Sequence, residues 1–399
     1  MYRVNFYFSR LLCVIKATIA WIIIKTFCRK LTFENIWLFE EKHTEARDNA
    51  YHLFSFIKKY HPEVNAYYVI AKDSPDEKKI YQLGSIVYAE TLKHYLYWMA
   101  AKYSISSQPH GAAPNPREWV CKLRGLCRKD QKTVFLQHGI IKDDLPSLDY
   151  AKTRFDLFVC SAVPELTYVR EGLHYPSDKA KLIGLCRFDN LNNYRTKKII
   201  LIMPTFRHWL RANDPDAEAT EQELARFRES EFFQNYFRLL TDKKLIKAAE
   251  ENGYRIIFYM HYALQSYVKS FDLCNNHIVK IANRHTYDVQ QLLKDSDVLV
   301  TDYSSVFFDF AFMEKPEVFY QFDLDSFRDG HYKAGYFDYR RDGFGPVFTQ
   351  ASEVTDHVVQ LLENGCKNNP EYLSRIHAFF PCRDSENCKR TFEVILEIK

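Results

Sequence analysis

Four short turns combine polar side chains with a position directly after an apolar, strand-like run. They are Gln137-His138-Gly139, Pro204-Thr205-Phe206-Arg207, Tyr259-Met260-His261 and Thr301-Asp302-Tyr303-Ser304-Ser305. Open α/β folds bind ligands at the carboxyl ends of their strands, where such turns lie. The turns supply hydroxyl, imidazole, guanidinium and backbone N–H groups, which bind phosphate and move protons. The sequence therefore predicts phosphate chemistry at the strand ends.

The fourth turn is the most informative of these. In Ser296–Asp309, SDVLVTDYSSVFFD, an apolar run ends at Thr301 and an amphipathic segment follows at once. This pattern predicts a buried strand, a tight turn and a helix capped by Ser304 or Ser305. A helix start carries unpaired N–H groups and a partial positive charge, so it can hold a phosphate. We expect Asp302 to shape the turn rather than to take part in chemistry.

The other turns supply a base, a cation and a second imidazole. His138 could take a proton from an attacking hydroxyl, and Gly139 allows a sharp turn with close ligand approach. Arg207 offers a planar fork for phosphate oxygens, with pairing to an acid as the alternative. His261 is predicted to be catalytic, binding a diphosphate or stabilising the leaving group, with a structural role as the alternative. Asp323-Leu324-Asp325 is a lone D-x-D that could hold a metal, although such triplets arise easily by chance.

The elements that must position these turns alternate between short strands and helices. This alternation predicts two doubly wound, mostly parallel α/β domains at 31–190 and 198–380, with a linker at Leu191–Lys197 and a C-terminal helix within 381–399. Two such domains facing a cleft form the GT-B arrangement of nucleotide-sugar transferases. There the second domain commonly holds the donor and the first holds the acceptor, which is an analogy at the level of the fold.

The N-terminal segment, residues 1–30, is predicted to associate with a membrane. Leu11–Ile24 is a mostly apolar run interrupted by Lys16 and flanked by basic residues. It is short for a bilayer span, so we favour an interfacial helix with Lys16 snorkelling and Trp21 at headgroup level. A spanning anchor and an ordinary buried helix remain alternatives. The positive flanks favour the cytoplasmic leaflet.

Composition and missing motifs exclude several classes. The chain has 399 residues, 16% aromatic, and a net charge of +4, which is too mild and dispersed to indicate a nucleic-acid partner. It lacks G-x-G-x-x-G, G-x-x-x-x-G-K-[ST] and G-x-S-x-G, which disfavours dinucleotide oxidoreductases, P-loop enzymes and α/β-hydrolases. Ten cysteines without a C-x-x-C pair indicate reduced cytosolic thiols.

Several motifs in order resemble one family, the CDP-glycerol glycerophosphotransferases of teichoic-acid and capsule synthesis. Ser296–Asp329 resembles the family's hallmark segment, and the resemblance extends from about Asn35 to Arg390. Further matches are Trp37-Leu38-Phe39-Glu40 with Asp48-Asn49-Ala50, Gln137-His138-Gly139, Ile183-Gly184-Leu185-Cys186-Arg187-Phe188-Asp189 and Pro204-Thr205-Phe206-Arg207. The chain departs from the family pattern at Gln137, where tryptophan is usual, and at Tyr262, where proline follows the histidine.

The resemblance implies a GT-B fold, membrane association and no required bound cofactor or metal. It implies that His138 deprotonates the acceptor hydroxyl and that CMP leaves from the attacked phosphorus. It assigns the donor diphosphate to His261, Arg207, Thr301, Ser304 and Ser305, and adds Gly139, Thr205 and Arg187 to the substrate-binding set. Phosphoryl transfer depends mainly on positioning and charge stabilisation, so these groups are chemically sufficient.

The resulting hypothesis is a transferase at the cytoplasmic face of the cell membrane, peripheral or monotopic. It would move glycerol phosphate or a related polyol phosphate from CDP-glycerol or another CDP-polyol to a lipid-linked or polymeric acceptor. One alternative is a GT-B glycosyltransferase that uses a nucleotide sugar. Another is a non-catalytic, membrane-bound subunit of a polymer-synthesis complex.

Overall fold

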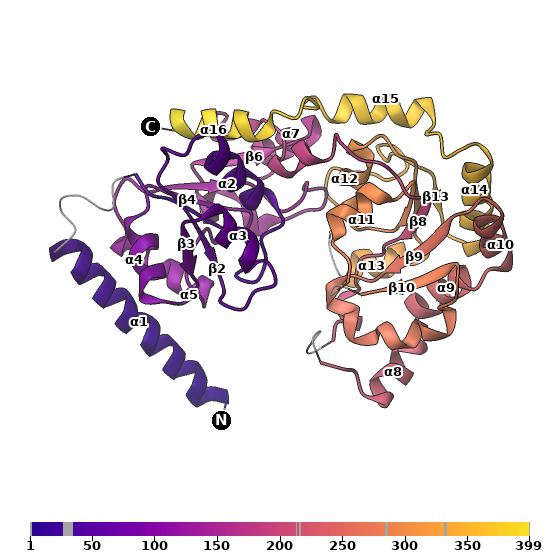
Figure 1. The fold of residues 1–399 in the computed structure, drawn as a ribbon, viewed down its shortest axis with the longest axis horizontal. Helices are drawn as coiled ribbons and strands as arrows, with labels where there is room; N and C mark the ends of the chain where they lie inside the picture. The colour runs from indigo at the N-terminus through magenta and orange to yellow at the C-terminus, as the bar shows by residue number, and fades with distance from the viewer. Residues whose placement is uncertain are drawn as a thin grey trace. The chain divides into compact units, whose positions relative to one another are not determined.

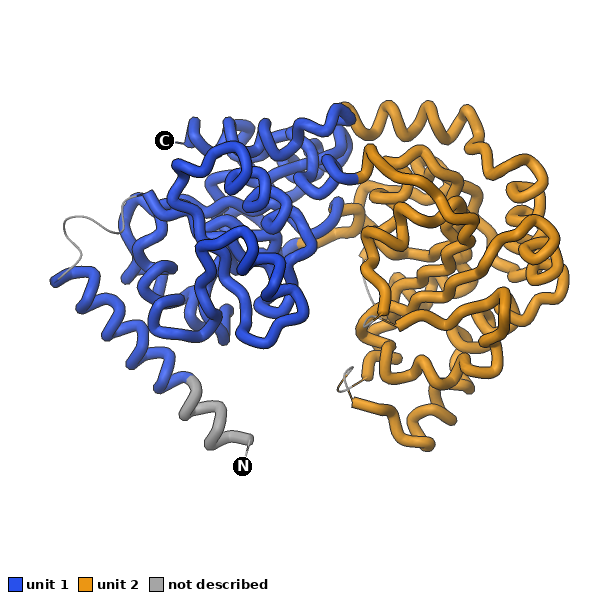
Figure 2. Tube along the Cα trace, in the orientation of Figure 1, with its two compact units in different colours: residues 1–140, 146–190, 382–399 blue, residues 141–145, 191–381 orange. Residues whose placement is uncertain are grey.

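The chain folds into two compact units, which Figure 2 colours separately. The computed structural model describes residues 2–26, 35–212, 214, 217–283, 286–330 and 333–398. Unit 1 holds residues 1–140, 146–190 and 382–399, and unit 2 holds residues 141–145 and 191–381. The C-terminal helix, expected as a segment of its own, therefore packs in unit 1. The short stretch 141–145 belongs to unit 2, although its neighbours in sequence belong to unit 1.

Unit 1 is built on a parallel sheet with helices around it (Figure 1). Within the described residues the sheet has seven strands in the order β3-β2-β1-β4-β5-β6-β7. Every neighbouring pair in this sheet is parallel. The strands are β1 (Trp37–Glu40), β2 (Ala66–Ile70), β3 (Ile86–Tyr88), β4 (Tyr103–Ser106), β5 (Lys132–Phe135), β6 (Leu157–Cys160) and β7 (Ala180–Leu182). The helices are α1 (Tyr2–Thr26), α2 (Asn49–Tyr60), α3 (Glu77–Leu83), α4 (Leu92–Ala100), α5 (Arg117–Val120), α6 (Tyr150–Thr153), α7 (Val163–Glu171) and α16 (Asn387–Glu397), with 3₁₀ segments η1 (Cys121–Leu126), η2 (Pro146–Leu148) and η3 (Cys186–Asn190).

Unit 2 repeats the design with a six-stranded sheet in its described residues, in the order β10-β9-β8-β11-β12-β13. All of its neighbouring strands are also parallel. The strands are β8 (Ile199–Ile202), β9 (Arg255–Tyr259), β10 (Val279–Ala282), β11 (Val298–Thr301), β12 (Glu317–Tyr320) and β13 (Val347–Phe348). The helices are α8 (Glu221–Arg228), α9 (Glu231–Leu240), α10 (Lys243–Glu251), α11 (Val289–Asp295), α12 (Val306–Phe312), α13 (Leu324–Gly330), α14 (Ala351–Glu363) and α15 (Pro370–Phe379), with η4 (His208–Leu210) and η5 (Tyr262–Cys274).

The sequence pattern explains why these segments form the two sheets. The central strands β8 and β11 are apolar and buried on both faces, as parallel strands covered by helices must be. One face of the unit 2 sheet packs on α9, α10 and α14 in a core rich in phenylalanine and tyrosine. Caps define the helix starts, as at Asp48 for α2 and at the Thr220–Glu223 capping box for α8. The prediction of two parallel α/β units is confirmed.

Helix α1 is longer than the apolar run that predicted it. Its small residues Cys13, Ala17 and Ala20 are buried in a core cluster that includes α4 residues, against which Ile24 also packs. Other, larger apolar residues of the helix are exposed, namely Leu11, Leu12, Val14, Ile15, Ile19, Trp21 and Ile22. The Nζ of Lys16 donates to the carbonyl oxygen of Glu90 at 2.7 Å. The expectation that Lys16 snorkels towards headgroups is therefore wrong, because its ammonium is bound to the protein. Of the helices in the described part of the chain, none is long and apolar enough to cross a bilayer.

Candidate active-site residues on the two units

The His138 turn lies at the carboxyl end of β5 and is held by buried side chains. Gln137 adopts a φ of 61°, in the left-handed region that few side chains adopt. Its Nε2 donates to the carbonyl oxygen of Val159 at 2.5 Å and to Oε1 of Glu165 at 3.1 Å. The other carboxylate oxygen of Glu165 accepts from the N–H of Ser161 at 2.8 Å. Gln137, which replaces the tryptophan usual in the family, thus ties the turn to the neighbouring strand β6.

Two motifs distant in sequence meet this turn. The amide of Asn49 donates to the carbonyl oxygen of Gln137 at 2.8 Å and accepts from the backbone N–H of Arg187 at 3.0 Å. The Nη1 of Arg187 donates to Asp48 Oδ1 at 2.8 Å and to the carbonyl oxygen of His138 at 3.1 Å. The structure therefore brings together three of the sequence motifs. Arg187 is nearly buried and acts on the backbone of His138, which fits a positioning residue better than the predicted substrate ligand.

The side chain of His138 is exposed, although protein atoms crowd its ring. This partial desolvation lowers the pKa of His138, the Asp48 carboxylate opposes the shift, and the Arg187 guanidinium adds to it. The imidazole is consequently neutral at neutral pH, which is the state a general base needs. Gly139, beside it, is partly exposed.

A buried carboxyl close to this site was not predicted. Both oxygens of Glu41 accept backbone N–H groups at the start of α2, from Arg47 at 2.9 Å, Asp48 at 2.9 Å and Tyr51 at 2.8 Å. Burial, with the nearby Asp48 charge, raises the pKa of Glu41 to about 8. The sequence carries a signal for it, since the acidic residue Glu41 directly follows β1 and precedes the start of α2. Its link to His138 runs through Asp48 and Arg187, which are distant from each other in sequence, so local sequence patterns do not reveal it.

In unit 2, Arg207 is an internal strut, that is, a buried side chain that joins the segments following β8, β11 and β12. Its guanidinium donates to both oxygens of Asp323, at 2.6 and 2.9 Å, to Asp302 Oδ2 at 2.9 Å and to the carbonyl oxygen of Thr205 at 3.1 Å. The side chain has no exposed surface. The predicted contact between Arg207 and a diphosphate does not fit this arrangement. The predicted alternative, pairing with an acid, describes it instead. The same pairing occupies Asp323 of the D-x-D triplet.

The strand ends beside this strut are joined by the turn that follows β11. Asp302 Oδ1 accepts from the N–H of Thr205 at 2.8 Å and of Tyr303 at 2.5 Å, as expected for a residue that shapes the turn. The hydroxyl of Thr301 donates to the carbonyl oxygen of Met203 at 2.7 Å and is fully buried. Thr301 therefore fixes strand β11 to the end of β8 and presents no surface to a ligand. Thr205 is also nearly buried. Its backbone N–H donates to Asp302 and its carbonyl oxygen accepts from Arg207, so its backbone is bonded to these two side chains.

His261 and Ser305 are the groups at this edge with the better access, whereas Ser304 is as buried as Thr205. His261 Nδ1 accepts from the N–H of Ala263 at 3.3 Å, so the neutral ring carries its hydrogen on Nε2. The ring stacks on Phe206, with centroids 4.6 Å apart. Ser305 is exposed at the start of α12 and Ser304 is mostly buried beside it. Because β9, β8 and β11 are neighbours in the sheet, the three turns that follow them lie at one edge.

The fold defines a class, the two-unit parallel α/β proteins of GT-B-like type. The chain belongs to the family described as CDP-Glycerol:Poly(glycerophosphate) glycerophosphotransferase, whose profile matches residues 22–397. Solved structures support the fold. The wall teichoic acid polymerase TagF aligns with a TM-score of 0.67 at 17% identity, covering 96% of this chain and 97% of that chain. A UDP-GlcNAc 2-epimerase from Neisseria meningitidis aligns with a TM-score of 0.52 at 11% identity.

Curated relatives come from teichoic acid synthesis. The minor teichoic acid biosynthesis protein GgaB of Bacillus subtilis is 31% identical over 366 residues, which cover 91% of this chain and 40% of GgaB. The teichoic acid glycerol-phosphate transferase of Staphylococcus aureus is 25% identical, with coverage of 88% of this chain and 89% of that protein. The chain thus spans less than half of the first relative and most of the second.

Proposed function

We propose that this protein transfers glycerol phosphate, or a related polyol phosphate, from a CDP-linked donor to a hydroxyl of a lipid-linked or polymeric acceptor in teichoic-acid-like synthesis. The observation that carries the proposal is the match to the glycerophosphotransferase family over residues 22–397, with the family's motifs converging at strand ends in each unit. A nucleotide sugar is the alternative donor, since the fold is compatible with both.

On unit 2, we assign the donor diphosphate to His261, Ser304 and Ser305. The Nε2–H of His261 and the serine hydroxyls are donors, and the turn after β11 adds backbone N–H groups. Arg207, Thr205 and Thr301 support them by holding the strand ends, through the Arg207–Asp302 and Thr301–Met203 contacts. This division revises the roles that the resemblance gave to Arg207, Thr205 and Thr301.

On unit 1, we assign the general base to His138. The neutral imidazole takes the proton of the acceptor hydroxyl, whose oxygen attacks the glycerol-side phosphorus while the bond to the CMP oxygen breaks. Arg187 and Asp48 act on this step through the backbone of His138. Gly139 gives the acceptor room to approach because it has no side chain.

A binding experiment separates the donor assignment from the fold. We expect purified protein to bind CDP-glycerol more tightly than a UDP-sugar in isothermal titration calorimetry. His261→Ala and the Ser304→Ala/Ser305→Ala double variant should each weaken CDP-glycerol binding about tenfold or more, because each removes hydrogen bonds to a charged group. The matched control is Thr241→Ala, which removes an exposed hydroxyl at the C-terminal end of α9 and should leave the affinity unchanged. Tighter binding of the UDP-sugar would favour the alternative donor.

We also propose that α1 attaches the protein to the cytoplasmic face of a membrane as a peripheral or monotopic helix. Its outer side exposes Leu11 (56%), Ile15 (44%), Ile19 (42%) and Ile22 (46%), and Lys25 lies at its end. Apolar side chains of this size contribute about 1.5–3 kcal/mol each when buried, and nearby cations favour anionic lipid. The small residues of α1 already face α4, so the large ones remain for lipid.

Flotation with vesicles tests this attachment. Ile15→Ser/Ile19→Ser/Ile22→Ser should reduce the fraction that floats with phosphatidylglycerol vesicles at least tenfold. The control is Leu273→Ser, which changes an 88% exposed leucine in unit 2. Equal flotation of the triple variant and the wild type would contradict the assignment. Loss of a dimer in light scattering, without loss of flotation, would assign the same surface to a second copy of the chain.

A further inference from the structure

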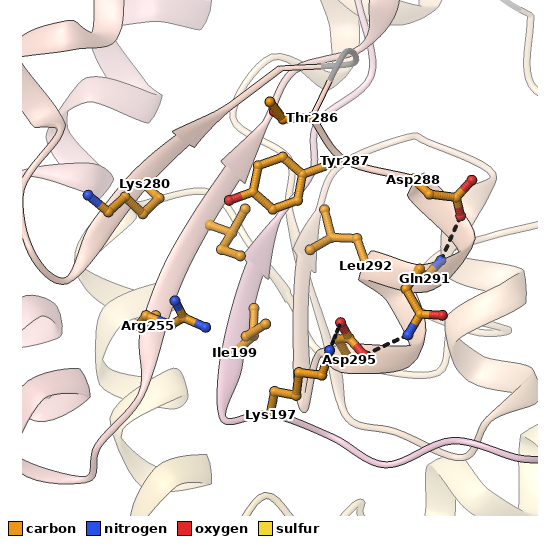
Figure 3. A pocket seen from close by; sticks show the side chains of 11 residues that line it. Lys197, Ile199, Arg255, Lys280, Thr286, Tyr287, Asp288, Gln291, Leu292 and Asp295 are labelled. Atoms are coloured by element: carbon orange, nitrogen blue, oxygen red, sulfur yellow. Dashed lines mark hydrogen bonds and ion pairs between the residues drawn. The ribbon is translucent and has the colours of Figure 1, made fainter. Parts of the chain in front are cut away.

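A groove on unit 2 lies along one face of the sheet, and its lining includes none of the candidate donor residues. It encloses about 400 Å³ and is lined by residues of β8, β9, β10 and α11 (Figure 3). Ile199 and Arg255 are the first residues of β8 and β9, whereas His261 and Thr301 lie beyond or at the carboxyl ends of their strands. The groove therefore begins at the amino ends of β8 and β9 and extends to residues 286–288, which follow β10, without including His261, Ser304 or Ser305.

The floor of the groove is apolar and the fold leaves it open. Ile199, Ile257 and Leu292 are buried beneath it, and the ring of Tyr287 lies over the same strand face. Helix α11 has only seven residues, a length of about 10 Å, so it covers only part of the sheet face formed by β9 and β10. Apolar and aromatic surface with polar groups at its margin is typical of a ligand site.

The charges around the groove leave two cations without partners. Asp295 pairs with Lys197 at 2.8 Å and accepts from Gln291 at 2.7 Å, and Asp288 accepts from the backbone N–H of Gln291 as the cap of α11. Both carboxylates are thus occupied. Arg255 and Lys280 have exposed side chains, and neither forms an ion pair within the part of the chain that the structure describes.

The spacing of these cations suits a chain of phosphates. Lys280 is in register with Ile257, two residues after Arg255 on the adjacent strand, so the Cα atoms of the two basic residues are diagonal neighbours about 7–8 Å apart, and their long side chains can adjust around that spacing. Successive phosphorus atoms in a glycerol-phosphate chain are separated by six bonds. Two residues of extended polypeptide also span six backbone bonds and measure about 7 Å. The two cations can therefore face consecutive phosphates.

We propose that this groove binds the polyol-phosphate chain of the acceptor polymer, with consecutive phosphates at Arg255 and Lys280 and the polyol carbons against Tyr287. The inference rests on the proposed function, which supplies the polymer. Binding here takes no part in bond making. It retains the polymer on unit 2 through residues other than those assigned to the donor diphosphate.

The test measures polymer binding directly, without donor or turnover. Fluorescein-labelled poly(glycerol phosphate), as a trimer and as a dodecamer, is titrated with full-length wild type and with Arg255→Gln/Lys280→Gln while anisotropy is recorded. Two lost surface ion pairs should weaken binding of the dodecamer about three- to thirtyfold and reduce its salt dependence. Tyr287→Ala should weaken it further. Both substituted cations are exposed, and unchanged circular dichroism confirms that the variant is folded.

The matched control removes the same charges elsewhere on unit 2. Arg226→Gln/Lys243→Gln changes two exposed residues, on α8 and α10, and should bind the dodecamer as the wild type does. Equal weakening in this control, or wild-type affinity in the groove variant, overturns the groove assignment. The binding titration contains no donor, so its result does not depend on turnover. If a separate assay shows no CMP release from CDP-glycerol while groove substitution still lowers polymer affinity, the transfer proposal is refuted and the groove assignment stands.

Discussion

Replacing Arg207 tests whether this residue is a strut or a donor ligand. The side chain is fully buried and makes bonds of 2.6, 2.9 and 2.9 Å to Asp323 and Asp302, which lie 116 and 95 residues away in sequence. Burial lowers the pKa of Arg207, but the Asp302 and Asp323 charges outweigh it and raise the pKa overall, so the guanidinium stays charged. Removing it leaves two buried carboxylates without a counter-charge.

The size of the effect follows from these contacts. Arg207→Met should lower the free energy of unfolding by about 3–5 kcal/mol, the cost of leaving a buried charge unpaired. Arg207→Lys keeps the charge but cannot grip Asp323 with two bonds, so we expect a loss of about 1.5–3 kcal/mol, that of one charge-assisted hydrogen bond. Arg207→Met/Asp323→Asn should recover part of the loss, because one unpaired carboxylate has been removed.

Equilibrium urea unfolding, followed by circular dichroism, measures all three variants. Together with the Asp323→Asn single variant, the double variant supplies the coupling energy between Arg207 and Asp323. Wild-type stability in Arg207→Met would refute the strut. Wild-type stability in Arg207→Lys together with a lost affinity for CDP-glycerol would instead restore the predicted contact with the donor diphosphate.

Three further predictions concern Glu41, His138 and Gly335. Because the pKa of Glu41 is raised to about 8, the folded state still binds a proton that the unfolded state has released above about pH 4.5. The free energy of unfolding should therefore fall as the pH rises from 5 towards 8. Glu41→Gln should make this fall smaller when unfolding in urea is measured between pH 5 and pH 8. The pKa of His138 lies below its usual 6.5, so the acid limb of the kcat/KM profile should have its midpoint below pH 6.5, and His138→Ala should reduce turnover about 10²–10⁴-fold; a midpoint above 6.5 would argue against His138 as the base. A Cβ at Gly335 would lie 2.4 Å from the carbonyl oxygen of Lys142, so Gly335→Ala should displace residues 141–145. We expect its free energy of unfolding in urea to fall by about 1–3 kcal/mol. The control Gly365→Asn, at an open position with a φ of 69°, should have little effect.

The strand-end turns could be predicted because their signals are local. Apolar runs of four or five residues that end in His-Gly, Thr-Phe-Arg or Asp-Tyr-Ser-Ser give both the strand and its turn. Parallel pairing then places the turns after β9, β8 and β11 at one edge. The same reasoning identified Asp302 as a turn-shaping residue, and its bonds to Thr205 and Tyr303 confirm this.

The roles of Arg207 and Thr301 could not be predicted in the same way, because burial and partners are set by distant parts of the chain. A guanidinium fork fits carboxylates as well as phosphates, and only the fold shows that Asp323 occupies it. Residues 141–145 join unit 2 through a bridge between Asp143 and Ala334 and an ion pair of 2.6 Å between Arg328 and Asp143. Such pairings over large sequence separations leave no trace in local periodicity.

The central claim is that this protein releases CMP from a CDP-polyol by forming a new phosphodiester. The most direct measurement incubates full-length protein with CDP-glycerol and a poly(glycerol phosphate) acceptor, follows nucleotide release by chromatography, and follows the phosphodiester signal by ³¹P nuclear magnetic resonance. CDP-ribitol and a panel of UDP-sugars run in parallel. We predict CMP release with a matching gain of phosphodiester from CDP-glycerol or CDP-ribitol, and neither with His138→Ala. Release of UDP from a sugar donor without any CMP, or no release from any donor, would contradict the account.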